Sequence, residues 1–307
     1  MKHKIILPKP LKKGDKIGVI APASPIPDRW KLEKGIEVLK NLGFEVEIGE
    51  HAFESNLYLA GTDEERLQDL MEFVERDDIK AIIAARGGYG TLRLLDKIEY
   101  EKFVFNPKIL MGFSDLTSLL IPISEKSGLV TFEGPMVASL FSKKDALSIE
   151  YFLKAIKIRD YTITPNPFQI HVIREGEATG RLLGGCLSLV NALIGTPYEP
   201  DFTDTILFLE DVDEPLYRID RMLTQLRLAG KLKKVKGIVF GDFVGDFDLK
   251  DLLKVIEDRT GDLGIPVVYG YPFGHGEHFV TIPIGPIGEL SVKKTFSHLK
   301  INFTISV

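Results

Sequence analysis

A serine stands where an apolar segment meets a helical pattern. Residues 109–111 predict a buried strand, Gly112 permits a bend, and apolar residues recur at helical spacing from Leu116. A serine at such a corner presents its hydroxyl outward, and the amide of Asp115 lies at a helix N-terminus, which favours negative charge. These features suit a nucleophile elbow, in which Ser114 attacks beside one donor of an oxyanion hole. A serine that only caps the helix gives the same pattern, so both interpretations stay open here.

A glycine-rich segment follows an earlier apolar stretch. Arg86-Gly-Gly-Tyr-Gly90 comes directly after the predicted buried strand 79–85. Glycine lets a backbone approach a ligand closely, so Gly87 and Gly88 are candidates for the second oxyanion donor. A phosphate loop is disfavoured because the segment lacks both the Lys-Ser/Thr ending and the Gly-x-Gly-x-x-Gly spacing. A tight turn is the simpler alternative.

A serine nucleophile needs a general base, and the chain has six histidines. His275 and His278 lie in the segment 271–278, and a glycine stands on each side of His275. A turn of this kind lets an imidazole reach across a cleft. The pair could also bind a metal together with Glu277. Glycines around one histidine fix two ligands poorly, so we expect no metal here.

The base in turn needs a carboxylate that orients it. Four acids follow the apolar residues 207–209, and Glu210 stands first, at the end of the predicted strand. Glu214 is the second candidate, and a solvated acidic loop or a cation site is the alternative for the whole run. Arg218 lies in the next run, 215–221, which opens a helix, and its guanidinium is suited to the carboxylate of a peptide-like substrate. It could equally pair with the neighbouring acids.

The composition excludes several classes of protein. The 307 residues are 44% hydrophobic and 27% charged, as in ordinary globular proteins of one large or two medium domains. A net charge of -5 argues against nucleic acid as a partner. A single cysteine, Cys186, cannot form an internal disulfide. We find neither a signal peptide nor a membrane span, and expect a cytoplasmic protein without a membrane partner.

Apolar strands alternate with helical patterns in the first half of the chain. We predict strands over 16–21, 44–48, 79–85, 109–111 and 130–132, and helices over 29–43, 62–75 and 141–160. Short buried strands in repeated βα units indicate a doubly wound parallel sheet.

The polar, proline-bearing stretch 160–167 marks a change of character. We therefore place the domains at 1–160 and 161–307. In the second half we predict strands over 171–173, 205–209, 237–240, 267–269 and 299–305, and helices over 187–193 and 220–228. This pattern is α+β or barrel-like.

Together these segments resemble a known family, the LD-carboxypeptidases. These are serine peptidases that include the murein tetrapeptide carboxypeptidases and the microcin C immunity proteins. The matching segments occur in the family's order and span nearly the whole chain: 11–22, 59–66, 85–90, 112–115, 180–185, 209–211, 217–221 and 274–276. A series of this length is far more specific than any one motif.

The resemblance implies a catalytic triad, with Ser114 as nucleophile, His275 as general base and Glu210 as orienter. It implies an oxyanion hole formed by the backbone amides of Gly88 and Asp115. It also implies a flavodoxin-like N-terminal domain, a smaller β-rich α+β C-terminal domain, a site between them, and a homodimer. On this basis the residues expected to bind substrate are Arg86, Gly87, Tyr89 and Arg218.

The implied reaction is hydrolysis, without metal or cofactor, of the amide that joins an L-centre to a terminal D-amino acid. In the murein branch it releases D-alanine from a muropeptide tetrapeptide during cell-wall recycling. In the immunity branch the substrate is a peptidyl or aminoacyl nucleotide. A non-catalytic, two-lobed protein that binds peptides or sugars is the alternative from another class.

One position departs from the family pattern. Cys186 stands in Gly184-Gly-Cys-Leu187, where the family usually has Gly-Gly-Asn-Leu. The thiol replaces an amide side chain expected near the cleft, which puts the substrate preference in doubt. We expect Cys186 to be a small buried residue and not a nucleophile.

Overall fold

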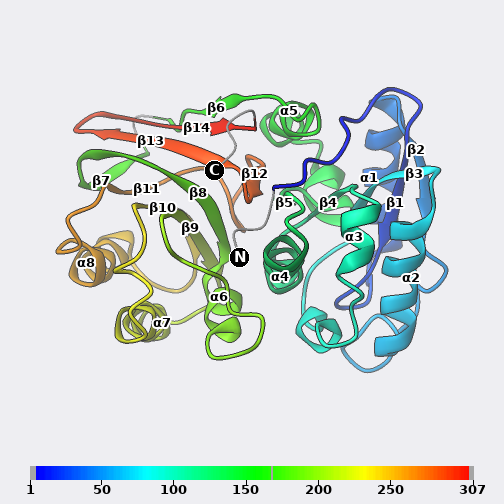
Figure 1. Ribbon diagram of the computed structural model, residues 1–307, viewed down its shortest axis with the longest axis horizontal. Helices are drawn as coiled ribbons and strands as arrows, with labels where there is room; N and C mark the ends of the chain where they lie inside the picture. Colours follow the sequence, from blue (N-terminus) through cyan, green and yellow to red (C-terminus); the bar gives the residue numbers. More distant parts are fainter. Residues whose placement is uncertain (1–4, 167–168, 304–307) are drawn as a thin grey trace. The chain divides into compact units, whose positions relative to one another are not determined.

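The structure is a computed structural model that describes residues 5–166 and 169–303 (Figure 1). The end of the predicted strand 299–305 and the first residues of the N-terminal segment lie outside the described residues. The chain forms two compact units. The first comprises 1–158 and 279–285, and the second comprises 159–278 and 286–307. The predicted boundary was 160, and the segment 279–285 belongs to the unit formed by the first half of the chain.

The first unit contains a six-stranded sheet in the order β12-β5-β4-β3-β1-β2. Its strands are β1 (Lys16–Ile20), β2 (Glu45–Ile48), β3 (Ile79–Ala84), β4 (Ile109–Gly112), β5 (Thr131–Glu133) and β12 (Ile282–Ile284). The first five are parallel, and β12 pairs antiparallel with β5. This confirms the doubly wound sheet and its flavodoxin-like order. The order reverses at β1 and β3, and ligands of such sheets bind beyond the carboxyl ends of the strands at that point.

Helices cover both faces of this sheet. They are α1 (Arg29–Asn41), α2 (Asp63–Glu75), α3 (Glu101–Phe105), α4 (Thr117–Ser127) and α5 (Ala146–Ala155), with short turns η1 (Thr91–Leu94), η2 (Ser114–Leu116) and η3 (Val137–Phe141). In Figure 1, α2, α3 and α4 pack next to one another, while α1 packs against η3. Right-handed crossovers place these two groups on opposite faces.

Local sequence explains where two of these helices begin. Thr62 accepts the amide hydrogen of Glu65, and the Glu65 carboxylate accepts that of Thr62, which is the capping box expected at this point. The helix predicted over 141–160 is shorter. It begins at Ala146, because Asp145 caps it by accepting the amide hydrogen of Ser148 at 2.8 Å.

The second unit contains an eight-stranded sheet in the order β6-β14-β13-β8-β9-β10-β11-β7. Its strands are β6 (Tyr161–Ile163), β7 (His171–Arg174), β8 (Gly176–Cys186), β9 (Thr205–Val212), β10 (Gly237–Val244), β11 (Val267–Tyr269), β13 (Ile287–Lys293) and β14 (Phe296–Asn302). Strands β8 to β11 are parallel, and the others pair antiparallel. This is the β-rich α+β fold predicted for the second half.

Three helices accompany this sheet: α6 (Leu187–Leu193), α7 (Leu216–Leu228) and α8 (Leu249–Thr260). Helices α7 and α8 pack side by side, as Figure 1 shows. Strands β9 and β10 are almost wholly buried, and their C-terminal halves carry the carboxylates described below. Within the described parts of the chain, no helix combines the length and the apolarity that a membrane span requires.

Candidate active site

Ser114 occupies a strained corner in the first unit. It follows β4 with a φ of +65°, which is left-handed backbone that residues other than glycine rarely adopt. Such strain costs on the order of 1–3 kcal/mol and concentrates at functional sites. Neither η2 nor α4 begins with a capping side-chain bond, and their N-cap residues are Phe113 and Leu116. The geometry therefore favours the elbow over a simple helix cap.

The glycine-rich loop lies directly against this serine. A Cβ atom added to Gly87 would come within 3.0 Å of the Ser114 Cβ and 3.2 Å of its Oγ. Gly88 has a φ of +121°, and a Cβ there would lie 2.3 Å from the Ser24 Oγ. The same Ser24 hydroxyl accepts the amide hydrogen of Tyr89 at 3.1 Å. A side chain at Gly87 would press against Ser114, and one at Gly88 would clash with Ser24, so glycine lets the loop pack between these two serines.

Asp115 is held rigidly behind the serine. Its side chain is buried, and its Oδ2 accepts the amide hydrogen of Thr91 at 2.8 Å. Its backbone carbonyl accepts hydrogen bonds from the Thr91 hydroxyl at 2.6 Å and from the Ser118 hydroxyl at 3.0 Å. Burial raises the pKa of this carboxyl, although the bonds from Thr91 oppose the change. These bonds hold Asp115, the residue that follows Ser114, through its side chain and its carbonyl.

In the second unit, the buried Glu210 contacts His275. The two groups join through Oε2 and Nδ1 at 2.7 Å. A carboxylate at this distance makes Nδ1 the protonated nitrogen, which leaves Nε2 able to accept a proton. Glu214 instead pairs with the Arg218 Nε at 2.8 Å. Of the two candidate orienters, Glu210 is therefore the one that contacts the imidazole.

The pKa of His275 is raised above its ordinary value by competing effects. Burial alone lowers it, but the hydrogen bond and charge of Glu210, with further negative charge on Asp211 and Asp213, outweigh that effect. The imidazole is therefore easier to protonate than in solution, as a general base requires.

The loop that carries His275 packs against β9 and β10. The register of β10 shifts between Phe240 and Phe243, and the Asp242 amide donates to the Phe273 carbonyl at 2.8 Å. The Asp242 carboxylate accepts the amide hydrogen of Gly276. A Cβ on Gly276 would lie 2.3 Å from Asp242 Oδ2, so only glycine fits at that position. The bulge in β10 thus aims a carboxylate at the histidine loop.

The remaining residues expected at the site have structural partners. Arg86 donates from Nη1 to the Pro25 carbonyl at 3.1 Å and from Nε to the Gly87 carbonyl at 3.2 Å. Tyr89 is half-exposed, and its ring meets that of Tyr58 edge-on at 5.5 Å between centroids. Arg86 therefore joins the loops that follow β1 and β3.

Cys186 is buried at the end of β8. Its Sγ lies 3.2 Å from the Ser188 Oγ and 3.4 Å from Asp211 Oδ1. Burial and the charges of Glu210 and Asp211 raise the pKa of the thiol well above its ordinary value. This environment disfavours a thiolate, in line with the expectation of a packed residue.

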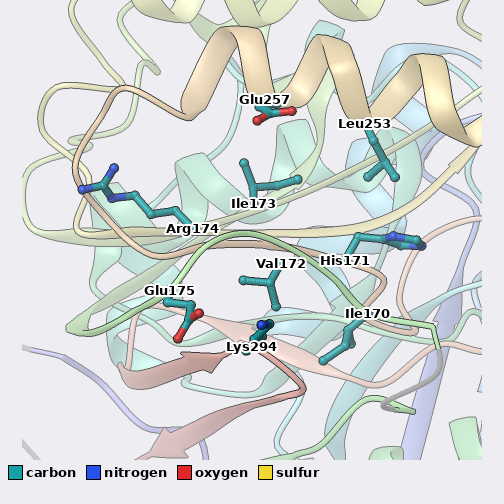
Figure 2. Close-up of a pocket in the computed structure, with 9 residues that line it drawn as sticks. All are labelled: Ile170, His171, Val172, Ile173, Arg174, Glu175, Leu253, Glu257 and Lys294. Carbon is teal, nitrogen blue, oxygen red and sulfur yellow. The ribbon is translucent and has the colours of Figure 1, made fainter.

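Two other features of the described residues bear on the site. Among them, no three His, Cys, Asp or Glu side chains group as a metal site would need. The second unit has a groove of about 760 Å³, and Figure 2 shows the residues that line it. It lies beside the edge strand β7 and is lined by residues 170–175, Leu253, Glu257 and Lys294. None of the expected site residues lines it, so we do not assign the reaction to this groove.

Comparison with known proteins agrees with this geometry. Residues 17–134 match the model of the LD-carboxypeptidase N-terminal domain, and residues 179–290 match that of the C-terminal domain. The chain belongs to the LD-carboxypeptidase family. It is therefore a peptidase, and the resemblance drawn from the sequence is confirmed.

Three similar proteins come from different bacteria. A probable murein peptide carboxypeptidase of Bacillus subtilis is 40% identical over 91% of this chain and 89% of its own. The crystal structure of a muramoyltetrapeptide carboxypeptidase from Oxalobacter formigenes is 34% identical, with a TM-score of 0.83 over 94% of this chain and 98% of its own. An MccF-like protein from Bacillus anthracis is 32% identical, with a TM-score of 0.91 over 97% of this chain and 99% of its own.

Several residues of this LD-carboxypeptidase that contact the site were not singled out from the sequence. Arg66 and Asp242 are the clearest examples. Arg66 shares the buried face of α2 with Leu70 and Phe73, so a charge in an apolar helical stripe was its signal. Asp242 follows the apolar strand residues 237–240, as Glu210 follows 207–209. An acid at the end of an apolar strand, as at Glu210, was therefore the signal that could have identified Asp242.

The Asp242 carboxyl of this LD-carboxypeptidase gives a prediction about stability. Burial and the charge of Glu210 raise its pKa from 3.8 to about 6, so the folded chain binds this proton more tightly than the unfolded chain. Its contribution to the free energy of unfolding is present at low pH and is lost as the pH rises through about 6. Asparagine cannot ionise. We therefore expect the free energy of unfolding of Asp242→Asn, relative to that of the wild type, to be higher near pH 8 than near pH 4.5 by about 2 kcal/mol.

Denaturant unfolding of both proteins at the two pH values measures this difference. The exposed Asp246, on the loop after the same strand, provides the control Asp246→Asn. A difference between Asp242→Asn and the wild type that does not change with pH would contradict the prediction.

Proposed function

We propose that this protein is a metal-free serine LD-carboxypeptidase that releases D-alanine from a muropeptide tetrapeptide. The nucleophile is assigned because Ser114 has left-handed backbone at a strand end, packed against Gly87. The substrate class is supported by the murein peptide carboxypeptidases among its relatives. The proposal includes a role in cell-wall recycling, a cytoplasmic location and a homodimer. It assigns the nucleophile to a domain of residues 1–160, and the base and its orienter to a domain of residues 161–307.

In the proposed mechanism Ser114 is the nucleophile, His275 is its general base, and Glu210 orients His275. The Ser114 Oγ attacks the carbonyl carbon of the L,D-amide while His275 Nε2 takes its proton, and Glu210 holds the resulting imidazolium through Nδ1. Negative charge develops on the carbonyl oxygen, where the amides of Gly88 and Asp115 stabilise it. The amide bond then breaks, and His275 gives its proton to the leaving D-alanine nitrogen. Water then attacks the carbonyl carbon of the acyl-serine while His275 takes its proton. The ester bond breaks, His275 returns the proton to the Ser114 Oγ, and the tripeptide leaves with a new carboxylate.

Binding of the peptide substrate is assigned to the loops around these groups. Gly87 packs against Ser114, and Tyr89 is exposed two residues further on. Arg86 and Arg218 carry the positive charge that carboxylates of a muropeptide require. Arg86 already donates hydrogen bonds to Pro25 and Gly87, and Arg218 is already ion-paired with Glu214, so substrate carboxylates would share or replace those contacts.

A second substrate class is favoured by one similarity. The MccF-like protein of Bacillus anthracis matches this fold with a TM-score of 0.91. The alternative function is therefore hydrolysis of a peptidyl or aminoacyl nucleotide by the same three residues. A non-catalytic peptide- or sugar-binding role is the alternative of another class.

Mass spectrometry of two substrates tests the proposal. Purified protein is incubated with a muropeptide tetrapeptide or with an aminoacyl nucleotide, each with and without a chelator. We expect the tetrapeptide to lose one alanine, at a rate that the chelator does not change. Faster cleavage of the nucleotide would support the second class. No cleavage of either would favour the binding role, and strong inhibition by the chelator would restore a metal to the mechanism.

A further inference from the structure

Arg66 is a charged side chain buried in the first unit. It lies on α2 and is only 1% exposed. A charge in such a place is costly unless it is paired and hydrogen-bonded, so its partners explain its presence. Burial lowers the pKa of its guanidinium, while the neighbouring Asp63 opposes that effect. The proposed mechanism gives this residue no part.

The partners of Arg66 are the backbones of two loops at the site. Nη1 donates to the Pro22 carbonyl at 2.5 Å and to the Gly90 carbonyl at 3.0 Å, while Nη2 donates to Asp63 Oδ1 at 2.5 Å. Pro22 begins the loop after β1, and Gly90 ends the glycine-rich loop after β3. These are the two strands at which the sheet order reverses. A single planar guanidinium thus fixes the spacing of both loops.

The approach of Arg66 to Gly90 is close enough to determine the residue type there. Gly90 has a φ of +135°, and an added Cβ would lie 2.7 Å from Nη1. The next residue, Thr91, bonds to Asp115 through both its amide and its hydroxyl. Arg66 is therefore linked through the Gly90–Thr91 peptide and its hydrogen bonds to Asp115, the residue after Ser114.

We propose that Arg66 is a positioning residue that sets the separation between the two oxyanion donors, the amides of Gly88 and Asp115. Gly88 lies two residues before Gly90, whose carbonyl accepts a hydrogen bond from Arg66. Asp115 accepts the amide hydrogen of Thr91, the residue after Gly90. An oxyanion hole acts through donors that are already in place when charge develops, so a small change in their separation weakens it. The inference rests on the proposed function, because it takes Ser114 as the nucleophile.

Three variants separate positioning from simple stabilisation of the fold. Arg66→Met keeps most of the volume and removes every donor, and Arg66→Lys keeps the charge without the planar fork. Arg93→Met is the matched control. Arg93 binds the same Asp63 carboxylate from the surface, with its Nε 2.8 Å from Oδ1 and its side chain 44% exposed. Losing it removes an ion pair to Asp63 but leaves both loop carbonyls bonded.

The readouts are the rate at which a fluorophosphonate phosphonylates Ser114, the Kd for the tripeptide product, and the melting temperature. The phosphonyl oxygen gains negative charge as Ser114 attacks, so its reaction depends strongly on the oxyanion donors. The affinity for the product is spread over contacts along the whole peptide and depends on those donors only in part. We expect both Arg66 variants to react about 10²–10³-fold more slowly, as when one such donor is lost. Their Kd for the product should stay within about threefold, and Arg93→Met should match the wild type in rate and in Kd.

Several outcomes would overturn the inference. One is a folded Arg66 variant that reacts within threefold of the wild type. Another is an equal loss of phosphonylation and of product binding. If Arg66→Met does not fold, Arg66→Lys decides, and failure of both to fold would make Arg66 a stability residue only. A wild-type protein that is not phosphonylated at Ser114 would instead refute the proposed function, and the inference with it.

Discussion

Replacing Ser114 by alanine is expected to lower kcat/KM for the tetrapeptide by about 10⁴–10⁶-fold while the fold is retained. The expected loss is that of a serine hydrolase without its nucleophile, because the remaining groups can only assist water. Alanine has no hydroxyl but bears the same Cβ as serine, so the left-handed φ of +65° at this corner should cost about the same for either residue. The chain should therefore unfold at nearly the same denaturant concentration as the wild type.

Glycine at the same position extends this prediction. Ser114→Gly should be equally inactive, but more stable by about 1 kcal/mol, because glycine adopts left-handed backbone without the cost of a Cβ. The exposed Ser55 provides the matched control, Ser55→Ala. Release of D-alanine by mass spectrometry and unfolding in denaturant are the measurements. Turnover by Ser114→Ala at the wild-type rate would refute the nucleophile assignment.

Replacing Glu210 by glutamine is expected to reduce kcat/KM by about 10³–10⁴-fold, because the amide no longer fixes the tautomer of His275 or stabilises its cation. The pH profile should move as well. His275 acts as a base only when neutral, and its raised pKa means that wild-type activity is lost as the pH falls through a value above the ordinary one. Without the charge of Glu210 that pKa falls, so the acid limb of the profile should shift to lower pH.

Glu214→Gln is the comparison that makes this test specific. Glu214 bonds to Arg218 and lies four residues along the chain from Glu210. Its substitution should leave the acid limb in place, whatever it does to substrate affinity. Initial rates of D-alanine release across the pH range measure both variants. An acid limb that shifts for Glu214→Gln and not for Glu210→Gln would exchange the roles of the two carboxylates.

The local patterns of the first half predicted most of its fold. The strands β1, β3 and β4 are short buried runs, and α2 begins at the Thr62 capping box. These signals lie within a few residues of one another, so the sequence carries them without knowledge of the fold. The prediction for the second half of the chain was less complete, because it missed β8, β13 and α8. Strand β8 contains four glycines and forms a strand because β13 and β9 pair with it on its two sides.

The sequence by itself determined which chemical groups this protein carries: a serine at a strand-to-helix corner, a histidine between glycines, and acids at a strand end. Only the tertiary structure decided that Ser114 has left-handed backbone, that Glu210 and not Glu214 contacts His275, and that Arg66 bonds to two loops. The reason is that these three facts depend on sheet register and on contacts between residues 24 to 65 positions apart. Hydrophobic periodicity indicates which face of an element is buried, but not which distant group it meets there.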